Sequence, residues 1–180
     1  MLSTQQLVHS PIQPVSFDQQ RAYPPAPVER LLKVSVIVPT LNEIDNIDLV
    51  LSGILFALRP HYAYEVLVAD GGSTDGTVER AQSWEAASDV RLVAGDGRRG
   101  LAGDVLDAAR LARGEVVVVM DADLSHSPGY LTALIDPVLD GTCDMAVGSR
   151  YVAGGATPNW PRHRRLLSQL GGLLARPFTE

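Results

Sequence analysis

The stretch "VVVVMDADLSHS", residues 116–127, sets a run of five apolar residues directly before two aspartates. The run ends at Asp121, and Asp123 follows one residue later. Like charges this close repel each other, and burying them without a partner is costly. The stretch therefore predicts a buried strand whose tip presents two carboxylates to something cationic.

Apolar runs and amphipathic patterns alternate on both sides of this stretch. The pattern predicts strands at residues 33–39, 64–70, 90–95, 115–121 and 144–150, and helices at residues 44–58, 74–87, 100–114 and 127–141. We expect Thr74 or Asp75 near the start of the second helix, Gly114 at the end of the third, and Ser127 with Pro128 at the start of the fourth. Apolar strands between amphipathic helices are typical of an α/β fold, a mostly parallel sheet with helices on both faces.

Composition limits the classes of function. The chain has 180 residues, which is enough for one domain with a core, and its net charge of -6 argues against a general nucleic-acid binder. Cys143 is the only cysteine, so an internal disulfide and a cysteine-based zinc site are excluded. The sequence shows no run of ~18 apolar residues and no signal-peptide pattern. The expected location is cytoplasmic.

The domain organisation follows from a change in composition near residue 33. Residues 1–32 are rich in Gln, Ser and Pro, with no apolar period, which predicts a disordered or loosely attached arm. Residues 33–180 then form a single α/β domain.

The ends of the strands carry most of the candidate site. Ligands of open parallel sheets bind beyond the carboxyl ends of the strands. Residues two apart in an extended tip point the same way, so Asp121 and Asp123 could converge on Mg²⁺ or Mn²⁺. The alternative is a helix cap beside a surface acid.

The other strand ends add weaker signals. In "DGGSTDGT" Asp70 could accept hydrogen bonds from a base or ribose, or the segment is a plain turn. In "PTLNE" Glu43 is either a ligand contact or a first-turn acid. Arg98 and Arg99 are either diphosphate partners or a solvated pair. Together these strand ends predict one site for a nucleotide diphosphate with a metal.

The last segment combines a basic head with a leucine-lined helix. Its basic residues are Arg150, Arg162, His163, Arg164 and Arg165, and leucines follow at helical spacing. This pattern favours an anionic lipid or a membrane surface. The alternative is an ordinary amphipathic helix that covers the sheet.

Three motifs carry a family resemblance. "VMDADLSH", "VGSRYVAGG" and "NWPRHRRLLS" occur in that order, together with "VSVIVPTLNE", "STDGT" and "ARGEVVVVMDAD". From about residue 34 to about residue 175, the sequence resembles the dolichol-phosphate (polyprenol-phosphate) mannosyltransferases of glycosyltransferase family 2. The resemblance implies a GT-A (Rossmann-like) fold, shortened at its C-terminal end, because the family continues beyond the position of Glu180.

The resemblance also implies an activity. It is the transfer of a sugar, typically mannose from GDP-mannose, to a polyprenyl or dolichyl phosphate with inversion at the sugar carbon. The implied partners are the nucleotide sugar and the lipid, with peripheral contact at the cytoplasmic face of the membrane. Competing readings are another nucleotide sugar such as UDP-glucose, or a non-catalytic nucleotide-binding fragment. A phosphatase of the haloacid-dehalogenase type is disfavoured because it needs a downstream lysine, and Lys33 is the only lysine.

Site residues carry over by position. The implied nucleotide-sugar residues are Pro39, Glu43, Asp70, Asp121, Ala122 and Asp123. The implied acceptor-phosphate residues are Arg150, Arg164 and Ser168, and the implied metal ligands are Asp121, Asp123 and Ser125. We expect Asp121, Asp123 and Arg150 to be the catalytic residues.

No catalytic base is assigned, because a phosphate acceptor is already anionic near neutral pH and needs positioning instead. His126 is therefore expected to be a loop residue or a support for the metal motif. Three positions depart from the family pattern. Leu41 replaces a tyrosine, Gly71 replaces the second acid of "DDGS", and Ser125 replaces a common glutamine. The first two keep the identity of the base and the sugar open.

Overall fold

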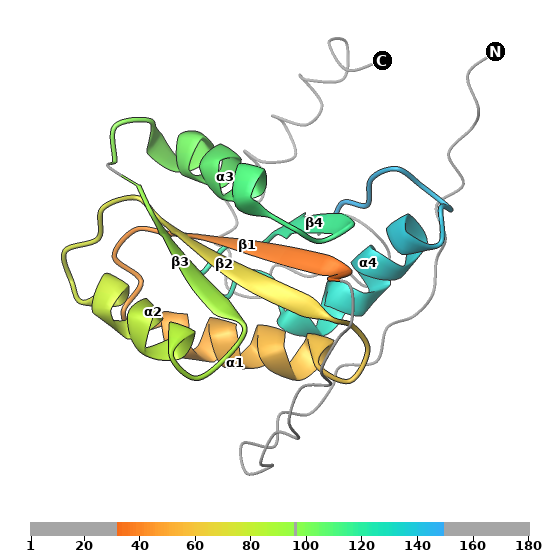
Figure 1. Cartoon of the computed structure of the whole chain (residues 1–180), viewed down its shortest axis with the longest axis horizontal. Coiled ribbons are helices and arrows are strands. Elements are labelled where there is room, and N and C mark those ends of the chain that lie inside the picture. Colours follow the sequence, from red (N-terminus) through yellow and green to blue (C-terminus); the bar gives the residue numbers. More distant parts are fainter. Residues whose placement is uncertain (1–31, 96, 150–180) are drawn as a thin grey trace, which may run out of the picture. The chain divides into compact units, whose positions relative to one another are not determined.

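The computed structural model describes residues 32–95 and 97–149, where strands and helices alternate (Figure 1). The strands are β1 (Val34–Thr40), β2 (Tyr64–Asp70), β3 (Val90–Ala94) and β4 (Val116–Val119). The helices are α1 (Ile47–Leu58), α2 (Thr77–Glu85), α3 (Gly100–Leu111) and α4 (Leu131–Leu139), and a short 3-10 helix, η1 (Pro128–Tyr130), leads into α4. All of them belong to one compact unit of the chain.

The four strands form one parallel sheet in the order β3-β2-β1-β4. Val34 of β1 pairs with Tyr64 on one side and with Val116 on the other. The chain moves outward from β1 to β3 and then returns to the opposite side of β1 with β4. The order therefore reverses between β1 and β4, and this is where such sheets form a crevice for ligands.

Helices cover both faces of the sheet, as the sequence predicts (Figure 1). On one face α1, α2 and α4 pack over the larger core cluster, which includes Val36, Val66, Ile54 and Ile135. On the other face α3 packs through Ala108 on Ile37 and Leu67. No helix in the described part of the chain is both long and apolar enough to cross a bilayer.

An ion cluster around the buried Glu65 carboxylate joins the amino-terminal ends of three strands. The carboxylate of Glu65, at the start of β2, accepts hydrogen bonds from the Ser35 hydroxyl at 2.8 Å and from the backbone N–H of Arg113 at 2.8 Å. The guanidinium groups of Arg113 and Arg91 donate to its second oxygen at 2.6 and 3.0 Å. This cluster ties the segment before β4 to β1 and β2, and so helps to fix the register of β4.

The structural requirement for glycine at position 114 differs from the expected one. Helix α3 ends at Leu111, so the prediction that Gly114 closes the helix is wrong. A Cβ at Gly114 would lie 2.5 Å from the backbone nitrogen of Ser35, and the N–H of Gly114 donates to the Ser35 hydroxyl at 2.8 Å. Glycine is required because two backbone segments meet here.

Strand β4 is less buried than predicted. Val116 and Met120 are buried, but Val117 is 44% exposed and Val119 is 53% exposed. In the described residues β4 pairs only with β1, and α3 contacts β1, β2 and β3. Among the described elements nothing covers one face of β4, and the run "VVVVM" alternates between core and solvent.

The predicted strand at residues 144–150 is also wrong over residues 144–149, which form no strand. Met145 is 76% exposed and Val147 is 71% exposed, so these apolar side chains have no layer to pack on in the described fold. An alternation of apolar and polar residues does not by itself supply a partner strand. The expected arm at residues 1–32 lies outside the described residues except for its last residue.

Candidate functional site

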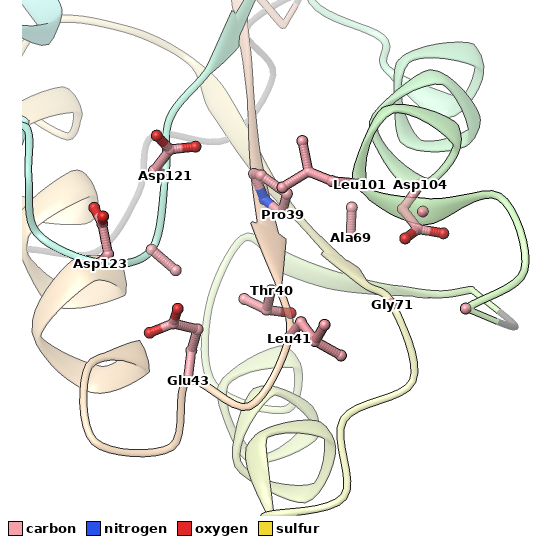
Figure 2. Close-up of a pocket in the computed structure, with 13 residues that line it drawn as sticks. Pro39, Thr40, Leu41, Glu43, Ala69, Gly71, Leu101, Asp104, Asp121 and Asp123 are labelled. Carbon is pink, nitrogen blue, oxygen red and sulfur yellow. The ribbon is translucent and has the colours of Figure 1, made fainter. Parts of the chain in front are cut away.

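A pocket opens at the carboxyl ends of β1, β2 and β4, where the strand order reverses (Figure 2). Its volume is about 350 Å³, within the usual range for small-molecule sites. It is lined by Pro39, Thr40, Leu41, Glu43, Ala69, Gly71, Gly97, Gly100, Leu101, Asp104, Asp121, Ala122 and Asp123. Five of the six residues predicted to hold a nucleotide sugar are in this lining, the exception being Asp70.

Asp121 and Asp123 line the pocket just beyond β4, with Ala122 between them. Ala122 is buried and packs in the larger core cluster, while both aspartates are exposed. The core contact of Ala122 therefore fixes the turn that carries both carboxylates. Figure 2 shows both side chains on the side of the pocket formed by the segment after β4.

The turn after Asp123 is built around that side chain. Leu124 adopts a left-handed conformation with φ of 58°, which is uncommon for a branched residue. It lets the Ser125 N–H and hydroxyl donate to the Asp123 carboxylate at 2.9 and 2.8 Å. Ser125, expected as a metal ligand, thus holds Asp123 in place. Its role in binding a metal stays a prediction.

Two opposing effects act on Asp123. Partial burial raises the pKa of its carboxyl. The two hydrogen bonds from Ser125 and the nearby imidazole of His126 lower the pKa by more than burial raises it, so the net pKa lies below the usual value. Asp123 is consequently ionised at neutral pH. His126 lies close enough to act on Asp123, and its expected role as a loop residue or a support for the metal motif stays a prediction.

The end of β1 supplies the floor of the pocket. Pro39 and Thr40 end the strand, and Asn42 adopts a left-handed conformation with φ of 57°. Asn46 donates to the Glu43 carboxylate at 2.9 Å, and the Glu43 N–H donates to the hydroxyl of Thr77 at 2.9 Å. The Glu43 side chain is therefore held at the pocket by its own helix entry.

The Asp70 carboxylate is held by hydrogen bonds within the protein. Its buried carboxylate accepts from the Thr40 hydroxyl at 2.9 Å, the Gly72 N–H at 2.9 Å, and the Ser73 N–H and hydroxyl at 2.8 and 2.6 Å. These bonds join the ends of β1 and β2 and shape the turn beyond them. The structure places the neighbouring Ala69 and Gly71 in the pocket lining instead. A contact between Asp70 and a ligand stays a prediction.

Asp104 is a pocket residue that the sequence reading missed. It lies on α3, is only 7% exposed and lines the pocket across from the acidic pair. The predicted site residues come from segments that follow strands, whereas Asp104 lies one turn inside a helix. An acid flanked by "GLAG" and "VLDAARLA", on the otherwise apolar face of the predicted helix, was the available signal.

The basic candidates are not gathered at the pocket in the described structure. Arg98 and Arg99 are both exposed, and Arg99 forms an ion pair with Asp107. Neither arginine is in the pocket lining. Arg150, Arg164 and Ser168, the expected acceptor-phosphate residues, lie outside the described residues.

The donor set suits a hard divalent cation with incomplete protein ligation. Asp121 and Asp123 provide carboxylate oxygens, and neither forms an ion pair within the described part of the chain. Residues 32–95 and 97–149 contain no group of three or more His, Cys, Asp or Glu side chains arranged to hold a metal. Two carboxylates fit Mg²⁺ or Mn²⁺ when substrate phosphates and water complete the oxygen shell.

Comparison with known proteins identifies the relatives of the chain. Residues 35–179 match the model of Glycosyl transferase family 2. The chain is 42% identical over 138 residues to a dolichol-phosphate mannosyltransferase of Pyrococcus furiosus, covering 77% of this chain and 39% of that protein. It is 40% identical over 163 residues to polyprenol monophosphomannose synthase of Mycolicibacterium smegmatis, covering 84% of this chain and 58% of that protein.

A solved structure also aligns with the chain. It is the mannosyltransferase PcManGT from Pyrobaculum calidifontis in complex with GDP-Man and Mn²⁺, with 42% identity and a TM-score of 0.47 over 55% of this chain and 29% of that chain. The family model covers most of the sequence, and the curated relatives are polyprenol-phosphate mannosyltransferases, as the motifs indicated. The chain belongs to glycosyl transferase family 2.

Proposed function

We propose that the chain is a metal-dependent, inverting glycosyltransferase that moves mannose from GDP-mannose to a polyprenyl phosphate. The observation that carries this proposal is the pair Asp121 and Asp123, which line a pocket at the reversal of strand order and form no ion pair within the described residues. The names of the curated relatives support the sugar and the lipid acceptor. Because the chain spans about half the length of those relatives, its activity is a proposal.

In this proposal the acidic pair would hold a divalent cation in the pocket that takes the donor. Asp121 and Asp123 hold Mg²⁺ or Mn²⁺, which when bound offsets the negative charge of the departing nucleoside diphosphate. Pro39, Glu43 and Ala122 line the same pocket and contact the rest of the donor. Ser125 keeps Asp123 in its orientation through two hydrogen bonds.

The acceptor does not need to lose a proton in the reaction. One oxygen of the lipid phosphate forms the new bond to the sugar carbon, while the bond from that carbon to the diphosphate breaks and its electron pair leaves with GDP. A phosphate monoester is anionic near neutral pH, so positioning replaces general-base catalysis. We propose that Arg150, Arg164 and Ser168 hold this phosphate, because guanidinium groups match phosphate oxygens. A lipid acceptor also requires peripheral contact with a membrane, which we propose is its cytoplasmic face.

The proposal is tested with the full chain, Mn²⁺, GDP-mannose and a polyprenyl phosphate in detergent. Formation of a mannosyl lipid is expected, and Asp123→Ala is expected to reduce it by about 100-fold or more, because the metal loses one of its two carboxylates. The matched control is Glu85→Gln, which changes an exposed carboxylate at the end of α2 and leaves transfer unchanged.

Two results contradict parts of the proposal. Transfer that survives Asp123→Ala shows that the metal assignment is wrong. A rise in the melting temperature with UDP-glucose and Mn²⁺, but not with GDP-mannose and Mn²⁺, favours the alternative donor, because a ligand that binds only the folded state raises the midpoint. Nucleotide binding without any transfer favours a non-catalytic binding role.

A further inference from the structure

The Asp104 carboxylate lies in an unusual position for a structural residue. It is 93% buried, as its exposure of 7% shows, and it forms no hydrogen bond or ion pair with residues 32–95 or 97–149. The fully buried polar atoms that lack a partner in the described residues do not include its oxygens, so the carboxylate keeps contact with solvent at the pocket and is available to a ligand. Asp104 also lines the pocket, and Figure 2 shows its side chain reaching from α3 toward the strand ends.

Two glycines make room for this carboxylate. A Cβ at Gly71 would lie 2.9 Å from Oδ2 of Asp104, and a Cβ at Gly95 would lie 2.4 Å from Oδ1. The ends of β2 and β3 are therefore bare of side chains where Asp104 reaches them. Gly71 is also the position at which the sequence lacks the acid that the family pattern carries. The carboxylate missing from the end of β2 is thus supplied from the facing helix.

The location of Asp104 relative to the acidic pair suggests which part of a ligand it meets. Asp104 lies against the ends of β2 and β3, Asp121 and Asp123 follow β4, and β1 lies between them. From β4 to β2 are two inter-strand steps, roughly 10 Å. A nucleoside diphosphate whose phosphates lie at the acidic pair extends across β1 with its nucleoside toward Asp104.

We propose that Asp104 is a specificity-determining residue that accepts a pair of hydrogen bonds from the nucleoside of the donor. A carboxylate is a double acceptor, and it matches two adjacent donors. Guanine offers such a pair in its N1–H and its exocyclic amine, and ribose offers one in its 2′ and 3′ hydroxyls. This inference rests on the proposed function, and it adds a binding residue that the family's motifs do not include.

The test measures binding of GDP to the full chain in the presence of Mn²⁺ by calorimetry. Asp104→Asn is expected to weaken GDP binding by about tenfold to 100-fold, the usual effect of losing hydrogen bonds to a charged group. Asp107→Asn, on the same helix, is the matched control and leaves the affinity unchanged, because Asp107 pairs with Arg99 and Arg110 outside the pocket. The melting temperature of Asp104→Asn without ligand is expected to stay equal or rise, whereas a structural role predicts a fall.

Ligand analogues distinguish the two sources of donors. If the base is read, the wild type binds GDP more tightly than inosine diphosphate, and Asp104→Asn loses that preference. If the ribose is recognised, the wild type binds GDP more tightly than 2′-deoxy-GDP, and Asp104→Asn loses that preference. Both outcomes support the proposal, and they name the group that is recognised.

A reciprocal exchange of positions provides rescue. The double variant Gly71→Asp with Asp104→Ala moves the carboxylate onto β2, into the space that the original side chain vacates. It is expected to recover at least part of the GDP affinity that Asp104→Ala loses, while Gly71→Asp alone crowds the existing carboxylate and weakens binding. Recovery of this kind is not expected from two structurally disruptive changes.

Failure of the inference and failure of the proposed function give different results. Wild type that binds GDP with Mn²⁺, together with an Asp104→Asn variant of equal affinity and equal preferences, overturns the role of Asp104 and leaves the proposed function intact. Wild type that binds neither GDP nor UDP with Mn²⁺ overturns both.

Discussion

Carboxylates at the two ends of the sheet differ in whether they have partners. At the amino-terminal end, Glu65 is surrounded by the guanidinium groups of Arg91 and Arg113 and by the hydroxyl of Ser35. At the carboxyl end, the carboxylates of Asp104 and Asp121 have no hydrogen bond or ion pair within the described residues. The first end is electrostatically complete, while the second carries uncompensated negative charge around a pocket.

The contacts at the amino-terminal end therefore contribute to the stability of the sheet, while the acids at the carboxyl end belong to the candidate site. Removing the buried Glu65 carboxylate leaves its hydrogen-bond donors without an acceptor and is destabilising, whereas solvent-accessible acids without a partner contribute little to stability. Uncompensated charge at the pocket is instead available to a cation or to the donors of a ligand. The comparison predicts that variants at the two ends change different measured quantities.

The largest effect on stability is expected at the amino-terminal end of the sheet. Glu65→Ala removes the acceptor for Arg91, Arg113 and Ser35, so we expect the free energy of unfolding to fall by about 3 kcal/mol. Denaturant unfolding followed by circular dichroism measures this loss. Glu115→Gln, which breaks only the exposed pair with Lys33, should change it by less than about 0.5 kcal/mol. Equal losses for the two variants would remove the distinction between the ends.

A smaller effect is expected from glycines that serve the two ends differently. At Gly114 a Cβ would meet the backbone of Val34 and Ser35 at 2.6 and 2.5 Å, and neither segment can move without disturbing β1. Gly114→Ala should therefore lower the free energy of unfolding by about 2 kcal/mol. At Gly71 the nearest atom is the end of the Asp104 side chain, which can rotate away. Gly71→Ala should cost under about 1 kcal/mol in the same thermal or denaturant assay.

The dependence of stability on pH should come partly from Glu65. Burial raises the pKa of its carboxyl, but hydrogen bonds from Arg113, Ser35 and Arg91 outweigh this, so the net pKa lies below the ordinary 4.5. An acid with a lowered pKa adds stability that is present above its unfolded value and is lost as the pH falls through its folded value. The stability difference between wild type and Glu65→Gln should therefore be constant above about pH 5 and shrink below pH 4.5. Unfolding curves at several pH values provide the measurement, and a difference that grows on acidification contradicts the assignment.

The smallest change in stability is expected at the carboxyl end of the sheet. Asp121→Asn removes one of two neighbouring negative charges, and we expect the free energy of unfolding without metal to rise by about 0.5 kcal/mol or less. The same variant should lose the rise in melting temperature that Mn²⁺ and GDP-mannose give the wild type, since ligand binding no longer favours the folded state. A variant that is destabilised without metal, yet still responds to Mn²⁺, would place Asp121 among structural acids.

Much of the fold and part of the site follow from sequence because strand ends of a parallel sheet meet at one edge. The positions of Glu43, Asp121 and Asp123 were predicted from this rule, that of Pro39 was implied by the family resemblance, and all four line the pocket. Burial of β4 was not predictable in the same way. A run of valines is equally compatible with a strand buried on both faces and with a strand buried on one face, and within the described residues the exposure of Val117 and Val119 shows the latter.

The positions of Asp70 and Asp104 relative to the pocket have a geometric explanation. Alternation along a strand decides which side chain faces the pocket, and a one-residue difference separates Asp70 from Ala69 and Gly71. Asp104 reaches the pocket only because α3 passes over the glycines at the ends of β2 and β3. Such a meeting of helix and strand is set by tertiary packing, which no local pattern in the sequence contains.

The order of the strands also has a consequence for the kinetics of folding. Ser35 and Glu65, which join β1 to β2, are 30 residues apart, whereas Lys33 and Glu115, which join β1 to the segment before β4, are 82 apart. Closing the longer loop costs about 0.9 kcal/mol more in chain entropy, and distant pairings slow folding. We therefore expect β4 to join the sheet after β1 and β2 have paired. Asp121 and Asp123 would then reach their positions after β1 and β2 have paired, so that the acidic pocket forms only on a sheet that is already built.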